Sequence, residues 1–364
     1  MKIRLFLTFD HELPLGEVGA SYEKALFAPT RRVMELAEKY GVKVSLFSDI
    51  LCAYRFKEWD YKGFYVPYEQ QLHCALKNGH DVQLHIHPHW LTTKYDGTSF
   101  IPSVDFTLSV FKENTHFGGI PGIVKLSIEQ LKEICTPVDE NYKCIAFRAG
   151  GYVVHPDSDI LFNSLYHKGI RYDSSMAKGY YFRSGLSEVD YRNLPKRPNW
   201  TIDPEHFPCA MTEMTEMTEM TEKPEKQGIM EIPIATMPKT LFETPTQFKL
   251  KKYAYRAAEN SGKMIFSKDK PDRSSRIKML LSARMLTFDN YTFSLDYLLK
   301  IVRHNRNRYK NKYDEVCMAL IAHPKSMGDY AFDLMEGFIS TIQKTEPEVS
   351  FTTFSDYHST QHGY

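Results

Sequence analysis

The two stretches that decide the fold are LTFDHELPLG, residues 7–16, and GHDVQLHIHPHW, residues 79–90. In each, an apolar run typical of a β-strand leads directly into carboxylate and imidazole side chains. In parallel α/β folds, functional groups gather at the carboxyl ends of the strands. We therefore expect both stretches to belong to one sheet, with these side chains either converging on a metal or forming solvated strand ends.

Outward from these two strands, apolar strand-like runs alternate with amphipathic helices that end at glycine, a pattern typical of βαβ units. Strands are expected at 2–9, 42–49, 80–86, 144–152, 171–176, 228–238, 315–323 and 349–354. Helices are expected at 30–41, 68–79, 127–135, 158–169, 293–305 and 330–343. The alternation predicts an α/β fold, a distorted (β/α) barrel of about seven strands built from residues 1–364 as a single catalytic domain.

Composition excludes several classes of protein. The formal net charge is +1 over 364 residues, and the scattered Lys and Arg give no footprint for nucleic acid. The apolar run near the amino end, LFLTF, is shorter than a secretory core, and no stretch has the ~20 apolar residues of a membrane span. Six widely spaced cysteines without a CxxC pair are typical of reduced thiols. We expect a cytoplasmic protein without a membrane span.

The alternation is interrupted at about 176–290. This region contains a tandem Met-Thr-Glu repeat, and we expect residues 205–228 to be a low-complexity surface insertion that is dispensable for activity. A basic run at 249–278 is either a solvated helix face and loop or a contact for an anionic substrate or membrane surface.

The sequence HIHPH offers two arrangements of imidazoles. Pro88 makes a continued central strand unfavourable but is compatible with the first turn of a helix. If the chain coils after His85, then His85 and His89 are i, i+4 neighbours that can bind one divalent ion. If the strand continues, His85, His87 and His89 share a face instead. We favour the coil and the pair His85 and His89.

The sequence FDHE supplies carboxylates to the same site. In an extended chain Asp10 and Glu12 project to one face and His11 to the other. Two carboxylates on one side allow one to bind metal while the other accepts a proton.

The motifs TFDHE, HIHPH, FRAGGY, YDSS and LIAHPKS, in this order, resemble those of the polysaccharide deacetylase family, also called the NodB-homology domain or carbohydrate esterase family 4. The resemblance covers residues 5 to about 355 apart from the insertion. It implies that Asp10 is the catalytic base, that His85 and His89 bind the metal, and that Arg148 holds the base.

The later motifs complete the set of residues that the resemblance implies. His323 corresponds to the general acid, Asp173 to the acidic residue that tunes this histidine, and Tyr152 to the aromatic residue whose backbone N–H serves the oxyanion. The chain departs from the family where His11 replaces a metal-binding Asp. Strand alternation favours Glu12 as the third ligand, with His11 as the alternative. A second departure is the pair of glycines before Tyr152, where the family has a proline.

Together these features predict a metal-dependent hydrolase that removes N-acetyl or other acyl groups from an amino sugar, with one divalent ion, most simply Zn²⁺. The expected substrate is a carbohydrate, either a polysaccharide or a cytoplasmic precursor such as a nucleotide sugar or a lipid-linked glycan. Two alternatives remain open. One is an amidohydrolase that acts on a non-sugar C–N bond, and the other is a barrel that binds saccharide without turnover.

Overall fold

The computed structural model describes residues 1–14, 16–17, 21–97, 100–204, 228–239, 263–264, 271–289 and 294–362. The Met-Thr-Glu repeat and most of the basic run at 249–278 lie outside the described residues. The dispensability of the repeat and the division into one domain with an insertion therefore stay predictions.

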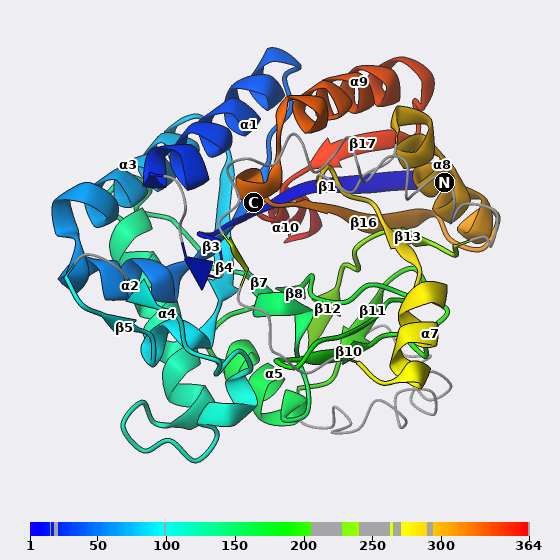
Figure 1. Cartoon of the computed structure of the whole chain (residues 1–364). Helices are drawn as coiled ribbons and strands as arrows, with labels where there is room; N and C mark the ends of the chain where they lie inside the picture. The colour runs from blue at the N-terminus through cyan, green and yellow to red at the C-terminus, as the bar shows by residue number, and fades with distance from the viewer. Residues whose placement is uncertain are drawn as a thin grey trace.

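A curled parallel sheet forms the centre of the molecule, with helices around it (Figure 1). Its order is β11-β12-β8-β7-β4-β3-β1-β16, and β17 adds to β1 beside β3. The strands are β1 (Lys2–His11), β3 (Ser45–Asp49), β4 (Asp81–Ile86), β7 (Ala146–Ala149), β8 (Tyr172–Asp173), β11 (Trp200–Ile202), β12 (Ile229–Glu231), β16 (Glu315–Ala322) and β17 (Val349–Thr352). All pairs are parallel except β11 with β12.

The sheet closes on itself through the segment that follows β12. Ile234 makes parallel bridges to Ala177 on one side and to Ala319 of β16 on the other. Its neighbour Ala235 donates its N–H to the Ala319 carbonyl at 2.8 Å, and the Ala319 N–H donates to the Pro233 carbonyl at 3.0 Å. In the described part of the chain, the ring therefore runs through β1, β3, β4, β7, β8, the β12 segment and β16. The expected distorted barrel is confirmed.

Helices cover the outside of this ring. They are α1 (Ala28–Lys39), α2 (Ile50–Trp59), α3 (Val66–Lys77), α4 (Gly119–Cys135), α5 (Ser158–His167), α7 (Arg273–Leu281), α8 (Leu295–Tyr309), α9 (Asp329–Thr345) and α10 (Phe354–His362). Short helical turns are η1 (Glu23–Phe27), η2 (Tyr61–Tyr65), η3 (Pro88–Leu91), η4 (Leu108–Phe111), η5 (Gly150–Tyr152) and η9 (Pro324–Ser326). The sequence patterns missed α2, which follows β3 directly at Asp49 without the usual glycine or turn signal.

Short two-stranded ribbons lie outside the main sheet. They are β5 (Lys94–Tyr95) with β6 (Phe100–Ile101), β9 (Tyr181–Arg183) with β10 (Glu188–Asp190), β13 (Thr236–Met237) with β15 (Arg284–Met285), and β2 (Gly16–Glu17) with β14 (Lys263–Met264). Within the ranges that are described, the helices are too short or too polar to cross a membrane.

Candidate active site

The register of the parallel strands brings the polar strand ends together. Phe9 of β1 lies opposite Ala322 of β16, so the next residues, Asp10 and His323, emerge side by side. His85 of β4 lies opposite Arg148 of β7, on the same edge of the barrel. These side chains, which are far apart in the sequence, therefore surround one point at the carboxyl end of the barrel, as the sequence predicts.

Asp10 is a buried carboxylate fixed by an arginine. Its Oδ1 accepts a hydrogen bond from Nη1 of Arg148 at 2.7 Å. Arg148 is itself fully buried, and it also donates to Thr8 Oγ1 and to the hydroxyl and carbonyl oxygens of Ser174. Burial works against the charged form of Asp10, but Arg148, with help from His85 and His323, outweighs it and lowers the carboxyl pKa. Asp10 is therefore ionised and held in one orientation.

The alternation expected in FDHE is confirmed. Glu12 reaches the same cluster as Asp10, and both lie 3.5 Å from Nε2 of His323. His11 points away toward α3, where its Nε2 donates to Gln71 Oε1 at 2.8 Å. Burial lowers the pKa of His11 to about 4, so this ring is a neutral packing residue. The structure thus places Glu12 in the cluster and His11 outside it.

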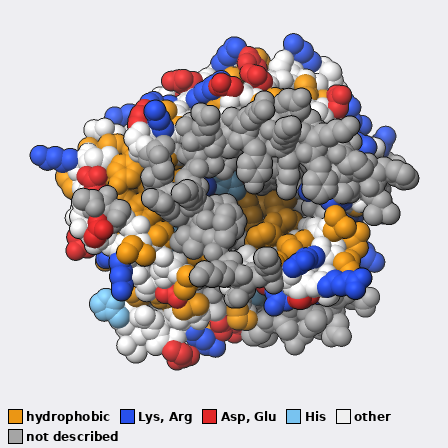
Figure 2. Space-filling view, in the orientation of Figure 1, with side chains coloured by type: hydrophobic (Ala, Val, Ile, Leu, Met, Phe, Trp, Pro, Cys, Tyr) orange, Lys and Arg blue, Asp and Glu red, His pale blue; other side chains and the backbone are white. Residues whose placement is uncertain are grey.

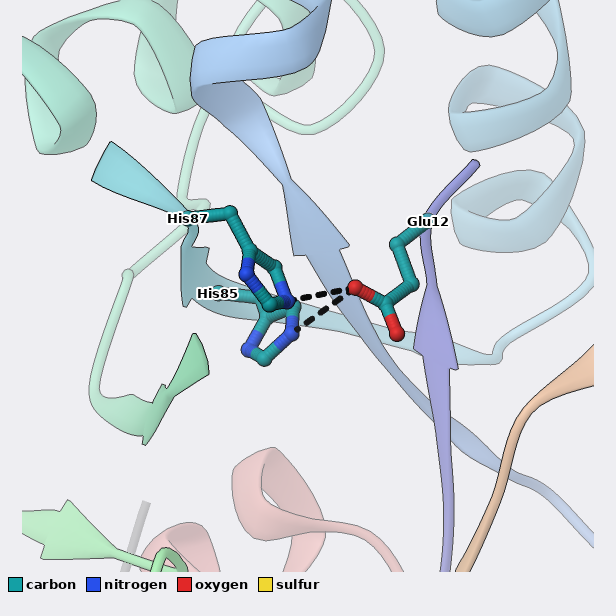
Figure 3. A group of neighbouring side chains, drawn as sticks. All are labelled: Glu12, His85 and His87. Atoms are coloured by element: carbon teal, nitrogen blue, oxygen red, sulfur yellow. Dashed lines mark ion pairs between the residues drawn. The ribbon is translucent and has the colours of Figure 1, made fainter. Parts of the chain in front are cut away.

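The coil expected after His85 is wrong, and with it the geometric argument for His89. His87 is still extended (φ −109°, ψ 97°), and η3 begins only at Pro88. His85 and His87 consequently project to the same side, and Figure 3 shows both rings directed at the carboxylate of Glu12. Nε2 of His87 lies 2.5 Å and Nε2 of His85 lies 3.5 Å from Glu12 Oε2. The ring of His89 stacks on Phe106, with ring centres 4.8 Å apart.

The pairing of β4 with β7 ends at Ile86. Pro88 has no backbone N–H, but beyond the last paired residue no sheet hydrogen bond is lost, so the chain can stay extended as far as His87. Gly150, the first glycine of FRAGGY, also leaves space for the ring of His87. A Cβ at Gly150 would lie 2.6 Å from His87 Nδ1 and from the Ile86 carbonyl oxygen, so only glycine fits beside this ring. Gly150 therefore makes room for His87.

Glu12, His85 and His87 fit a divalent ion. Nδ1 of His85 donates to the carbonyl of Arg148 at 2.9 Å, so Nε2 is the ring nitrogen that faces the cluster. Within the described chain, the buried atoms His85 Nε2, His87 Nε2 and Glu12 Oε2 contact one another as ion pairs and make no further hydrogen bond, and both ring nitrogens of His89 are likewise without a hydrogen-bond partner. The ligand atoms of the trio lie within 4.8 Å of one another. One carboxylate and two imidazoles that leave further positions open are typical of a catalytic zinc site.

His323 is held by a carboxylate that the sequence motifs did not identify. Its Nδ1 lies 2.9 Å from Asp289 Oδ2, and its backbone N–H donates to Asp289 Oδ1 at 2.7 Å. Burial disfavours the imidazolium, but Asp289, followed by Asp10 and Glu12, outweighs it and raises the pKa of His323 to about 9. At neutral pH this side chain is a cationic proton donor.

Asp173 does not have the position expected for the residue that tunes His323. Its carboxylate accepts hydrogen bonds from the backbone N–H and hydroxyl of Ser175, at 3.1 and 2.7 Å. It also interacts with the buried Glu231, and burial raises the pKa of both carboxyls. The assignment is corrected because β8 turns Asp173 toward β12, whereas the bridge between Thr287 and Ile321 sets Asp289 beside His323.

Tyr152 lies at the end of η5 with a left-handed backbone, φ 65°. Its carbonyl accepts a hydrogen bond from the Tyr191 hydroxyl at 2.5 Å, and its ring packs edge-on against Tyr180. The contribution of its N–H to an oxyanion site remains a prediction.

Two further charged residues at the site were missed by sequence reasoning. Lys325 donates to Glu12 Oε1 at 2.8 Å and to the Leu13 carbonyl at 3.0 Å. Burial opposes ionisation of Glu12, but Lys325 and then His87 reverse this and hold its pKa well below the usual range. Asp49, at the end of β3, lies opposite His85 and accepts a hydrogen bond from Trp90 Nε1 at 2.6 Å. The signal available was that Asp49 is the last residue of β3 and that Lys325 lies three residues beyond the end of β16.

Figure 2 shows a hollow near the centre of the face seen in Figure 1, with a histidine and hydrophobic side chains visible inside it.

No family model and no curated protein matches this chain. Solved structures do. A protein from Mycobacterium smegmatis described as a "putative polysaccharide deacetylase" is 12% identical over 100% of this chain and 91% of its own, with a TM-score of 0.48. An allantoinase is 11% identical over 100% and 92%, with a TM-score of 0.49. A polysaccharide deacetylase from Bacillus cereus is 10% identical over 97% and 92%, with a TM-score of 0.38.

Proposed function

We propose that the protein is a metal-dependent hydrolase that removes an acyl group from the nitrogen of an amino sugar. The observation that supports this proposal is that an ionised carboxylate and a protonated imidazole both face one buried cluster of candidate metal ligands. Asp10, ionised by Arg148, and His323, protonated by Asp289, both face the unsatisfied atoms of Glu12, His85 and His87.

A divalent ion held by Glu12, His85 and His87 would supply acidification of a water molecule and polarisation of the amide carbonyl. The remaining chemistry belongs to side chains. Asp10 Oδ2 accepts the proton of the attacking water, since Arg148 occupies its other oxygen. His323 Nε2 then donates a proton to the departing amine, while Nδ1 keeps its own proton in a hydrogen bond to the Asp289 carboxylate, which stabilises the imidazolium. The carbon–nitrogen bond breaks, and a carboxylic acid and a free amine result.

The charges in the site indicate which of the two residues accepts a proton and which donates one. A carboxylate whose pKa is lowered cannot serve as the acid, and a histidine whose pKa is about 9 cannot serve as the base at neutral pH. The assignment of Asp10 as base and His323 as acid therefore has a physical reason that is independent of the motif resemblance.

The finer part of the proposal concerns the substrate, an N-acetylated nucleotide sugar or lipid-linked glycan in the cytoplasm, and zinc as the ion. Purified protein would be treated with a chelator, reloaded with Zn²⁺ and assayed with both substrate types, by acetate release, and with a cyclic amide. Release from an amino sugar only after reloading supports the proposal. For the cyclic amide, which releases no acetate, ring opening would be measured instead. Ring opening of the cyclic amide alone would identify an amidohydrolase of another class, and binding of saccharide without any turnover would identify a binding protein.

A further inference from the structure

The short helix α7 (Arg273–Leu281) presents an unusual outer surface. Its inward side carries Ser275, buried at 2% exposure, whose hydroxyl accepts a hydrogen bond from Tyr181 of β9 at 3.1 Å. On the outward side Ile277, Leu280 and Leu281 are 50%, 48% and 60% exposed. Their spacing of i, i+3 and i+4 makes one apolar stripe.

Strand β9 lies beside α7 and is tied to it by the ion pair between Arg183 and Asp272, 3.2 Å apart. Figure 2 shows hydrophobic side chains together with Lys and Arg side chains over the place of α7, on the face that carries the hollow. We call Ile277, Leu280 and Leu281, with Arg273 and Arg276, the α7 patch.

The charged side chains in the segment that contains this stripe are mostly cationic. Residues 271–285 contain four cationic side chains, Arg273, Arg276, Lys278 and Arg284, against the single acid Asp272. Asp272 is already engaged, because it caps α7 through the Ser275 N–H and pairs with Arg183. Arg273 and Ile277, like Arg276 and Leu280, are i, i+4 neighbours, so the exposed arginines border the apolar stripe directly.

We propose that the α7 patch docks the protein onto the surface of an anionic lipid bilayer. A helix with exposed Leu and Ile bordered by Arg matches the chemistry of an interfacial segment, in which apolar side chains enter the acyl boundary and cations meet lipid phosphates. A second copy of the chain is a poor occupant, because a symmetric contact would bring the two cationic rims together. The proposal does not depend on the reaction proposed above.

The side chains over the place of α7 and the hollow are both visible on the face shown in Figure 2. From α7 the chain runs through β15 to Asp289, which holds His323. The docking surface and the candidate site are thus joined by a short stretch of ordered chain.

The test is sedimentation of the full chain with vesicles of phosphatidylcholine alone or mixed equally with phosphatidylglycerol. We expect binding to the anionic vesicles that weakens as salt is raised. Arg273→Glu with Arg276→Glu should lower partitioning by about tenfold or more, because each cation near an anionic surface contributes about fivefold. Leu280→Ser with Leu281→Ser should lower it by a similar factor, through loss of apolar burial.

Two matched variants control for general charge and general hydrophobicity. Lys62→Glu with Lys77→Glu reverses two exposed charges near α3, and Ile101→Ser with Val104→Ser removes two exposed apolar side chains near β6. Both should bind vesicles like the unmodified protein. Absence of binding to anionic vesicles, or equal binding by the α7 variants, would overturn the proposal. A dimer in size-exclusion chromatography that Leu280→Ser with Leu281→Ser converts to monomer would assign the patch to a second copy instead.

Discussion

Asp289 binds His323 twice, through the imidazole Nδ1 at 2.9 Å and through the backbone N–H at 2.7 Å. The two contacts fix both the ring and the chain at the end of β16, and they direct Nε2 toward Asp10 and Glu12. The orientation and the charge of the candidate acid therefore both depend on a residue 34 positions earlier in the chain.

Replacing this carboxylate should change how activity depends on pH. Asp289→Asn removes the largest effect that raises the pKa of His323, so this pKa should fall from about 9 and the alkaline limb of kcat should move to lower pH. We expect kcat to fall by roughly tenfold or more with a smaller effect on KM. Asp173→Asn is the matched control and should leave the alkaline limb in place. A limb that shifts in Asp173→Asn but not in Asp289→Asn would contradict the assignment.

The metal ligands can be separated by measuring metal content. Glu12→Gln and His87→Ala should lose bound zinc, because each removes one atom of the unsatisfied cluster. His11→Ala and His89→Ala should retain it, since these rings are bonded to Gln71 and stacked on Phe106 respectively. Melting temperatures would show which variants are merely unstable. Retention of zinc by a folded His87→Ala protein, with loss in His89→Ala, would restore the pair inferred from the sequence.

Asp10→Asn should keep the metal but abolish most turnover. The amide cannot accept a proton from water at neutral pH, and loss of a general base typically costs about 10² to 10⁴ in rate. Arg148→Met provides a contrast, because it leaves a buried carboxylate without its counter-charge and should destabilise the fold by roughly 3–5 kcal/mol. Rate measurements combined with thermal unfolding distinguish the two. Substantial activity in Asp10→Asn would require a different base.

Gly150→Ala should disturb the site without touching any candidate ligand. The added Cβ would meet His87 Nδ1 and the Ile86 carbonyl oxygen at 2.6 Å, so the ring of His87 must move. Zinc affinity and kcat should both fall. Gly337→Ala is the control, since its Cβ would lie 3.2 Å from the movable end of Leu295 in a helix. If Gly150→Ala binds zinc as tightly as the unmodified protein, His87 is not a ligand.

The buried pair of Asp173 and Glu231 predicts a loss of stability at high pH. Burial, with the nearby Asp173, raises the pKa of Glu231 well above its usual value, so the folded state keeps a proton that the unfolded chain releases. The stabilisation is complete below the pKa of the unfolded group, near 4.5, and is lost as pH rises through the higher folded pKa. Glu231→Gln should flatten this dependence of melting temperature on pH. An unchanged slope would mean that the pair does not share a proton.

The sequence by itself determined the barrel and much of its site. Alternating strands and helices predicted the ring, and the positions of Asp10, Glu12, His85, Arg148 and His323 directly after strands predicted that they meet. The period of two within FDHE was sufficient to separate Glu12 from His11, because β1 is extended as far as His11 and directs this ring toward Gln71. These features are local or follow from parallel pairing, so the pattern of residues contains them.

Only the tertiary structure shows where the rings of His87 and His89 lie, and that Asp289 and not Asp173 contacts His323. The choice at HIHPH depends on where the strand stops, and that point is set by the pairing of Ile86 with Ala149 and by the space beside Gly150, neither of which is visible in the local sequence. Asp289 lies in the stretch that interrupts the alternation, and a single bridge between Thr287 and Ile321 brings it to His323. The identity of such partners depends on strand register across distant parts of the chain, which residue patterns do not specify.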